Sequence, residues 1–354
     1  MNIIEYIEEN KNTTFEDKHF NDVDALILAQ FSYSYIENFQ RKWGKEFKIH
    51  MLDQEDIKNS AQFSLTEDEE EDFMNALKDS DRFKDLEIVD IEQAEECQFF
   101  AYTIRIDKHT LAVVYRGTNT SFDGWFESLS LAFDEEIPAQ IKAKEYLKKI
   151  GDEFNDNLLV IGHSKGGNFA VFASSLQDKA LQDRIELVYD FDGPGFLDEF
   201  YQRPDYIPIN EKIRKFIPKK SLFGLLLRSD SKPIVISSEG LMVWQHSQFT
   251  WFIENDQIVN AGELTDLSLH TRNVAANLLK SYDKEERKAV LVALHELFEN
   301  IEADNVLDLF NHKLSSLFKI FKHMNNEDNE NMQVLKDVAS DLFHLIKDEA
   351  KIKL

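Results

Sequence analysis

The segment that most limits how this chain can fold is 158–170, with the sequence LLVIGHSKGGNFA. Its first four residues are apolar, as in a strand buried on both faces of a sheet, and the residues after Ser164 favour a helix. Gly162 and Gly166 flank Ser164 at a spacing that permits a very tight turn between the two. Such a turn holds a serine hydroxyl at the carboxyl edge of a sheet, beside a helix N-terminus that favours developing negative charge. The segment therefore predicts a strand, a turn and a helix that present Ser164 as a nucleophile.

Strand and helix patterns alternate around this segment. The β-rich runs 98–106 and 111–115 are separated by a short polar stretch and predict a hairpin. Other apolar runs typical of buried strands lie at 158–161, 185–191 and 234–238, and helical patterns lie at 20–42, 138–150 and 165–177. This order predicts an α/β fold with a mostly parallel sheet flanked by helices.

Strand patterns stop near residue 270, and apolar residues then recur at helical spacing to the end of the chain. We therefore predict an α/β domain over residues 1–270 and a helical C-terminal extension over 271–354, which offers a surface for a protein partner or for self-association. Residues 53–82 are acidic and are expected to form a surface helix and loops. We interpret the run Glu67–Asp72 as a solvated face and not as a metal site, since no histidine lies among its carboxylates.

The charge balance excludes several classes of partner. The chain carries 40 Lys and Arg against 66 Asp and Glu, for a formal net charge of −26. Nucleic acid and anionic lipid surfaces both require clustered basic residues, so neither is an expected partner. The single cysteine, Cys97, forms no internal disulfide and gives no metal cluster, and no cofactor is expected. An acidic start without a signal-peptide pattern, and no apolar run of about 18 residues, predict a cytoplasmic protein without a transmembrane segment.

A serine nucleophile needs a base, which follows the serine and the acid along the chain in folds with this turn. His246 lies in a loop just after the run 234–238, where the last strand would deliver it to the edge that holds Ser164. His163, inside the turn itself, is expected to face away from the site and to serve in packing. The other histidines after Ser164 are His270, at the start of a predicted helix, and His295, His312, His323 and His344, in the predicted extension. We predict His246 as the base.

The acid that orients the base has three candidates. Asp192 ends the strand after the nucleophile and precedes a Gly-Pro-Gly turn at the carboxyl edge. Asp230 lies on the following connection, and Asp190 precedes Asp192 by two residues on the same strand face. We rank Asp192 first, Asp230 second and Asp190 third, although an aspartate before Gly-Pro is also ordinary turn chemistry.

An oxyanion hole in such a site takes one backbone amide from the residue after the nucleophile and one from an earlier loop. The first is Lys165. The second is expected in the loop after the strand 111–115, where Thr118 could also add its hydroxyl. The Lys165 side chain has two interpretations: a cation that binds an anionic substrate group, or a salt bridge to a nearby aspartate, which we favour.

Together these pieces resemble the α/β-hydrolases of the class 3 (fungal-type) lipase group, and in particular an uncharacterised bacterial branch of it known as a domain of unknown function. The resemblance covers about residues 20–270 and rests on Val113–Thr118, Asp123–Trp125, Gly162–Gly167, Phe191–Gly195, Pro218–Gly224 and Gln245–Trp251. It implies Ser164 as nucleophile, His246 as base, and Thr118 with Lys165 as the oxyanion hole. Lipases of this group carry their acid in an Asp-x-Val-Pro segment, where this chain has Ser221. The acid has therefore moved, to a residue such as Asp192, or is missing.

Two classes of function follow from this sequence. The first is a serine esterase or lipase-like hydrolase that cleaves a small-molecule acyl ester or lipid-like substrate through an acyl-enzyme on Ser164. The second is a catalytically weak or inactive hydrolase fold that serves as a binding protein, which the missing standard acid and the helical extension favour. An acyltransferase would use the same residues as the hydrolase.

Overall fold

The computed structural model describes residues 1–44, 46–61, 67–118, 136–221, 223–240 and 242–266, with short pieces between 127 and 134 and between 268 and 292. The helical extension predicted over 271–354 therefore lies almost entirely outside the described residues. The alternative histidines His270, His295, His312, His323 and His344 lie outside them as well.

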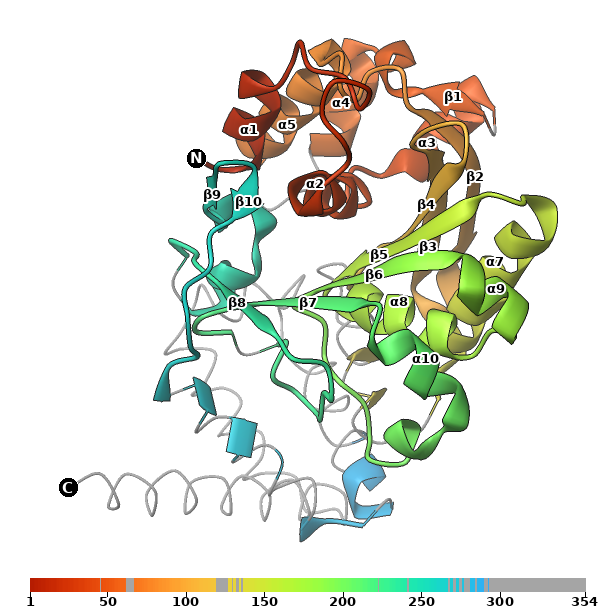
Figure 1. Cartoon of the computed structure of the whole chain (residues 1–354), viewed down its shortest axis with the longest axis vertical. Helices are drawn as coiled ribbons and strands as arrows, with labels where there is room; N and C mark the ends of the chain where they lie inside the picture. Colours follow the sequence, from red (N-terminus) through yellow and green to blue (C-terminus); the bar gives the residue numbers. More distant parts are fainter. Residues whose placement is uncertain are drawn as a thin grey trace.

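Helices and strands alternate along most of the described chain (Figure 1). The helices are α1 (Ile3–Glu9), α2 (Asp22–Phe31), α3 (Ile36–Trp43), α4 (Gln54–Ala61), α5 (Glu67–Asp79), α7 (Pro138–Glu153), α8 (Lys165–Ser175), α9 (Lys179–Arg184) and α10 (Ile207–Asn210). The strands are β1 (Phe47–Lys48), β2 (Glu87–Ala94), β3 (Phe99–Arg105), β4 (Thr110–Tyr115), β5 (Asn157–His163), β6 (Ile185–Phe191), β7 (Ile213–Pro218), β8 (Ile234–Ile236), β9 (Ile253–Glu254) and β10 (Gln257–Ile258). Among these described helices, none is both long enough and apolar enough to cross a bilayer.

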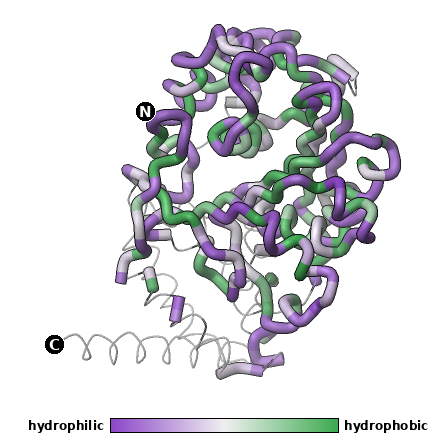
Figure 2. The backbone as a smooth tube through the Cα atoms, viewed as in Figure 1, coloured by the Kyte–Doolittle hydropathy of each residue, from purple (hydrophilic) through white to green (hydrophobic). Residues whose placement is uncertain are grey.

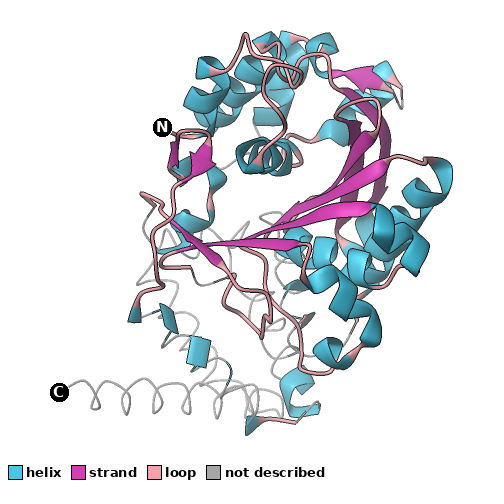
Figure 3. Cartoon of the chain, in the orientation of Figure 1, coloured by secondary structure: helices cyan, strands magenta, loops and turns pink. Residues whose placement is uncertain are grey.

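Strands β1 to β8 form one sheet in the order of the sequence, within the part of the chain that the structure describes. The pairings from β1 to β4 are antiparallel, and those from β4 to β8 are parallel. The predicted hairpin is the β3–β4 pair, in which Thr103 lies opposite Val113. The prediction of an α/β fold with a mostly parallel sheet flanked by helices is confirmed (Figure 3).

The sheet separates two hydrophobic layers. Side chains alternate between its faces, so Ala112 and Val114 of β4 lie in the layer of α2, whereas Leu111 and Val113 lie in the layer of α7 and α8. Figure 1 shows α2 on one side of the sheet and α7, α8 and α10 on the other. Figure 2 shows that hydrophobic residues are frequent along the central strands. Because both faces are covered, the parallel strands can be apolar almost throughout.

Several parts of this layout differ from the sequence-based expectation, and strands β1, β2, β9 and β10 were not predicted. The helix predicted over 20–42 is divided into α2, which ends at Phe31, and α3, which is preceded by Tyr35 in a left-handed conformation with φ 47° that no helix can contain. Strand β7 was not expected, since Arg214 and Lys215 interrupt its apolar pattern. Lys215 is nevertheless buried, with its ammonium group against the Asp190 carboxylate at 2.5 Å.

The acidic run of α5 is also more than a solvated face. Glu70 is buried and accepts hydrogen bonds from the Ser34 hydroxyl and, at 3.1 Å, from the Gln30 amide. Burial raises the pKa of this carboxyl to about 7, because the charged form loses its hydration. The interpretation of Glu67–Asp72 as entirely solvated is therefore wrong at Glu70, which holds α5 against α2.

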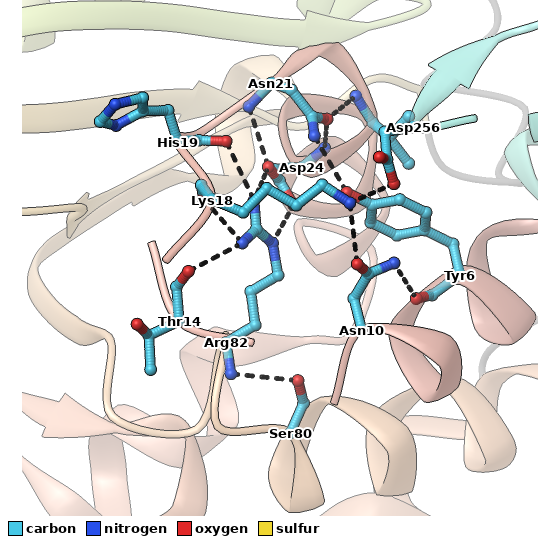
Figure 4. Close-up of polar contacts among 11 residues, drawn as sticks. Tyr6, Asn10, Thr14, Lys18, His19, Asn21, Asp24, Ser80, Arg82 and Asp256 are labelled. Atoms are coloured by element: carbon cyan, nitrogen blue, oxygen red, sulfur yellow. Dashed lines mark hydrogen bonds and ion pairs between the residues drawn. The ribbon is translucent and has the colours of Figure 1, made fainter. Parts of the chain in front are cut away.

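A buried ion pair fastens the N-terminal helices to the rest of the molecule (Figure 4). The Arg82 guanidinium donates to both Asp24 carboxylate oxygens, at 2.7 and 2.6 Å, and both side chains are fully buried. Its remaining N–H groups donate to the carbonyls of Thr14, Lys18 and His19 at 3.0 to 3.3 Å. All five donors of the guanidinium are thus used by the protein itself. We call Arg82 and Asp24 the N-terminal clamp.

Replacing Arg82 with Met is expected to lower the free energy of unfolding by about 3 to 5 kcal/mol, because the Asp24 carboxylate would remain buried without its partner. Urea titration measures this difference. Arg203→Met is the matched control, since Arg203 pairs with Glu136 at the exposed surface and should cost at most about 1 kcal/mol. Equal losses in the two variants would contradict the structural role of the clamp.

Glu70 predicts a specific pH dependence of stability. Its pKa is near 4.5 when unfolded and about 7 when folded, so the folded state binds the proton more tightly. The stabilisation is fully present below pH 4.5 and is lost as the pH rises through 7, by about 3 kcal/mol in total. Glu70→Gln should remove this loss, as measured by urea titration at several pH values. Glu69→Gln, at an exposed position of the same helix, should keep the wild-type dependence of stability on pH. If Glu70→Gln also keeps it, the loss of stability does not come from Glu70.

Candidate active site

Ser164 occupies a strained turn between β5 and α8. Its backbone has φ 58° and ψ −131°, a conformation that residues with a side chain rarely adopt. The turn is tight enough that a Cβ atom on Gly162 would lie 2.0 Å from the Gly166 carbonyl oxygen. The Ser164 amide donates to the Phe191 carbonyl at 2.9 Å, which ties the turn to the end of β6. This is the geometry of a nucleophile elbow, with the serine side chain half-buried at the carboxyl edge of the sheet.

The loop after β4 lies directly against Ser164. A Cβ atom on Gly117 would come within 2.9 Å of the Ser164 Cβ atom and 2.6 Å of the His163 carbonyl oxygen. Gly117 is therefore required by close approach. Thr118, the next residue, exchanges a hydroxyl–hydroxyl hydrogen bond of 2.5 Å with Ser128. The structure thus brings Thr118 to the nucleophile turn, as the sequence predicts for an oxyanion-hole residue.

His246 and Asp192 form a hydrogen bond at the same edge. His246 ends a short 3₁₀ segment, Met242–His246, that follows β8, and Asp192 is the first residue after β6. The His246 Nδ1 atom donates to the Asp192 Oδ2 atom at 2.6 Å. Asp192 is 1% exposed at its side chain and His246 is 19% exposed. The ring of His246 lies 4.4 Å from the ring of His163, the residue before Ser164, which places the base beside the nucleophile turn.

The second carboxylate oxygen of Asp192 is held by the loop after β7. Its Oδ1 atom accepts a hydrogen bond from the Ser221 hydroxyl at 2.5 Å and one from the Gly224 amide at 3.1 Å. Ser221 is the residue that the resemblance to class 3 lipases aligns with their acid, and its hydroxyl contacts the Asp192 carboxylate.

The other two acid candidates are engaged elsewhere. Asp190 is buried and pairs with Lys215, and it also accepts the Gly193 amide at 2.8 Å. This arrangement fastens the turn after β6. Asp230 pairs with the Arg228 guanidinium at 2.7 Å, and Arg228 is half-exposed. The structure therefore brings Asp192 to His246 and places Asp190 and Asp230 in other ion pairs.

Lys165 forms a buried ion pair with Glu127, a glutamate where we expected an aspartate. The Lys165 side chain is 1% exposed. Burial lowers the pKa of the Lys165 ammonium group, against the opposing effect of Glu127, and burial likewise raises the pKa of the Glu127 carboxyl. As the first residue of α8, Lys165 has a backbone amide without a carbonyl partner in its own helix. That amide is available to an oxyanion, while the side chain points into an ion pair.

An apolar side chain packs against the base. The Phe223 ring lies 4.3 Å from the His246 ring, on tilted planes. Two large apolar side chains close to these residues in sequence are exposed: Trp244, two residues before His246, at 43%, and Leu226, three residues after Phe223, at 38%. Apolar side chains at a binding site favour an apolar substrate group.

Sequence reasoning did not identify several contacts of this site. No sequence motif indicates the hydrogen bond from Ser221 to Asp192 or the ion pair of Glu127 with Lys165. His163 is buried, as expected for a packing residue, but its Nε2 atom lies 2.8 Å from the His246 carbonyl oxygen and its Nδ1 atom lies 2.8 Å from the Tyr33 hydroxyl. No sequence signal links Tyr33 to this edge, because it lies 130 residues before His163.

One comparison with known proteins identifies a family. No curated protein and no solved structure matches the chain significantly. Residues 77–298 match the model of the family described as Mbeg1-like. Since that match covers more than half of the chain, the protein belongs to the Mbeg1-like family, a lipase-like family whose α/β-hydrolase character fits the sheet and the strained serine turn.

Proposed function

We propose that this protein is a serine hydrolase that cleaves a carboxylic ester, with Ser164 as nucleophile, His246 as base and Asp192 as acid. The observation that carries the proposal is the 2.6 Å hydrogen bond between His246 and Asp192, at the edge where Ser164 occupies its strained turn. A nucleophile, a base and a group that orients the base are the three parts that acyl transfer on serine requires.

The reaction proceeds through an acyl-enzyme. The Ser164 hydroxyl oxygen attacks the ester carbonyl carbon while its proton passes to the Nε2 atom of His246, because the Nδ1 atom is occupied by Asp192. The negative carbonyl oxygen is stabilised by the backbone amides of Thr118 and Lys165. The carbon–oxygen bond to the alcohol then breaks, and the alcohol leaves with the proton from His246. A water molecule repeats the sequence and releases the carboxylic acid.

The substrate is a neutral ester with an apolar acyl or alcohol group. Phe223 packs against the base, and Trp244 and Leu226, close in sequence to His246 and Phe223, are exposed apolar side chains. The Lys165 ammonium group faces Glu127, and this pairing favours the interpretation that it does not bind an anionic substrate group. An acyl ester or lipid-like molecule fits these surroundings.

The alternative function, an inactive hydrolase fold that serves as a binding protein, was motivated by the missing acid at Ser221. Asp192 weakens that motivation, because its carboxylate lies within hydrogen-bond reach of His246. An acyltransferase shares every residue of the proposed mechanism. Competition between water and added alcohol acceptors distinguishes it from a hydrolase.

Ser164→Ala is expected to abolish covalent labelling by a fluorophosphonate and turnover of short- and medium-chain p-nitrophenyl esters, because only the serine oxygen forms the covalent bond. Labelling is read by intact-mass spectrometry. Ser231→Ala, at a buried serine that bonds Asn210, is the control and should keep both activities. A wild-type protein that neither reacts with the probe nor turns over any of these esters would refute the proposal.

Asp192→Asn and Asp230→Asn separate the two leading acid candidates. Loss of the Asp192 carboxylate should lower kcat on the order of 10⁴-fold, since an amide cannot hold the same His246 tautomer or stabilise its imidazolium. Asp230→Asn should stay close to wild type, because Asp230 pairs with Arg228 away from His246. Steady-state kinetics on p-nitrophenyl esters gives both values, and the opposite ranking would assign the acid to Asp230.

A further inference from the structure

Tyr33 and His163 form a chain of contacts that reaches the base from behind. Tyr33 lies between α2 and α3, and its hydroxyl is 2.8 Å from the His163 Nδ1 atom. The Nε2 atom of the same ring is 2.8 Å from the His246 carbonyl oxygen. The two imidazole rings lie 4.4 Å apart at an interplanar angle of 36°. His163 therefore contacts both the backbone and the ring of His246.

The partners of His163 define its tautomer. A carbonyl oxygen only accepts hydrogen bonds, so the His163 Nε2 atom must carry the proton that it donates to His246. In a neutral ring the Nδ1 atom is then an acceptor, and the Tyr33 hydroxyl is its donor. Burial lowers the pKa of His163 well below its usual range, and the neighbouring His246 acts in the same direction. The ring is thus neutral with its proton on Nε2.

Tyr33 also contacts the oxyanion loop. A Cβ atom on Gly117 would lie 2.3 Å from the Tyr33 hydroxyl oxygen, so this hydroxyl lies directly against the backbone of Gly117. One hydroxyl group therefore touches the residue before Thr118 and the residue before Ser164. Through His163 it also reaches His246. The three parts of the proposed site meet at this pair of side chains.

The His246 ring has a second ring neighbour. The Phe223 ring lies 4.3 Å from it, nearly as close as the His163 ring. Asp192 holds the Nδ1 atom. Two packed rings and one hydrogen bond restrict rotation of the imidazole, so its Nε2 atom keeps one direction.

We propose that Tyr33 and His163 are positioning residues that align the catalytic base with the nucleophile, and that the N-terminal helical layer thereby completes the active site. This inference rests on the proposed hydrolase function. It assigns a role to a residue outside 77–298, the part of the chain that matches the family model. The His246 carbonyl sets the His163 tautomer, the Tyr33 hydroxyl donates to the remaining ring nitrogen, and His163 contacts the backbone and the ring of His246.

Tyr33→Phe tests this role with a single-atom change. We expect kcat on p-nitrophenyl esters to fall by roughly 10- to 100-fold, a part of the contribution of a well-placed general base, while KM stays within about twofold because the apolar surface is intact. Tyr102→Phe is the matched control: the Tyr102 hydroxyl is buried and donates to the Leu28 carbonyl of α2 at 2.7 Å, away from the site. Equal kcat values for the two variants would overturn the proposal.

His163 variants add a rescue experiment. His163→Gln keeps an N–H donor near the position of the Nε2 atom, whereas His163→Leu has no donor. We expect kcat of the glutamine variant to be at least about tenfold higher than kcat of the leucine variant, at matched thermal stability. Equal losses in both would show that His163 acts by packing alone.

A measurement that does not depend on activity separates this inference from the proposed function. Long-range ¹H–¹⁵N NMR of the histidine rings, with His163 assigned from the His163→Gln spectrum, reports which ring nitrogen carries the proton. We expect the Nε2–H form of His163 in the wild type and in Tyr102→Phe, and in Tyr33→Phe a shifted Nδ1 resonance, because that nitrogen loses its hydrogen-bond donor. A protonated or Nδ1–H His163 in the wild type overturns the inference. If the wild type gives the expected spectra but is not labelled by the fluorophosphonate, the hydrolase function is refuted, whereas the contacts of His163 with Tyr33 and His246 are supported.

Discussion

The parallel pairing of β4 through β8 is the constraint on which the candidate site depends. At the carboxyl edge the ladder continues beyond the strands: Ser164 donates to the Phe191 carbonyl, Asp192 to Phe216, and Lys219 to Ile236. Each loop therefore leaves the sheet at a fixed height relative to its neighbour. Because residues on adjacent parallel strands lie about 4.8 Å apart, side chains from β5, β6 and the loop after β8 can meet without any long connection to guide them.

Within this edge the carboxylate has two supports. Asp192 presents one oxygen to His246 and the other to Ser221 and Gly224. Ser221, which the resemblance to class 3 lipases aligns with their acid, follows β7, one strand further along the sheet. Its hydroxyl makes a polar contact across the gap between the ends of β6 and β7. The two residues are buried, so each satisfies a group that would otherwise lack a partner.

Much of this arrangement could be predicted from local sequence. The strand, the glycine spacing and the helix around Ser164 are contiguous in the chain, and the apolar runs of β4, β5 and β6 are typical of strands covered on both faces. Strand β7 could not be predicted because Lys215 is buried by its pairing with Asp190, which is a contact between different strands. The roles of Glu70 and Tyr33 could not be predicted for the same reason, since their burial and their partners depend on how α2 and α5 pack. Hydrophobic patterns show local periodicity, whereas these residues are defined by tertiary contacts.

The N-terminal layer connects stability to the geometry of the site. The clamp of Arg82 and Asp24 fixes the start of α2, and α2 packs on β4 and β5. Tyr33 follows the end of this helix, so its hydroxyl reaches His163 only if α2 keeps its place on the sheet. Glu70 holds the same region through Ser34, the next residue. Buried charges are costly unless paired, and here their partners lie on the helix that carries Tyr33 to the base. The acidic N-terminal part of the chain is therefore a structural support for the catalytic edge as well as a charged surface.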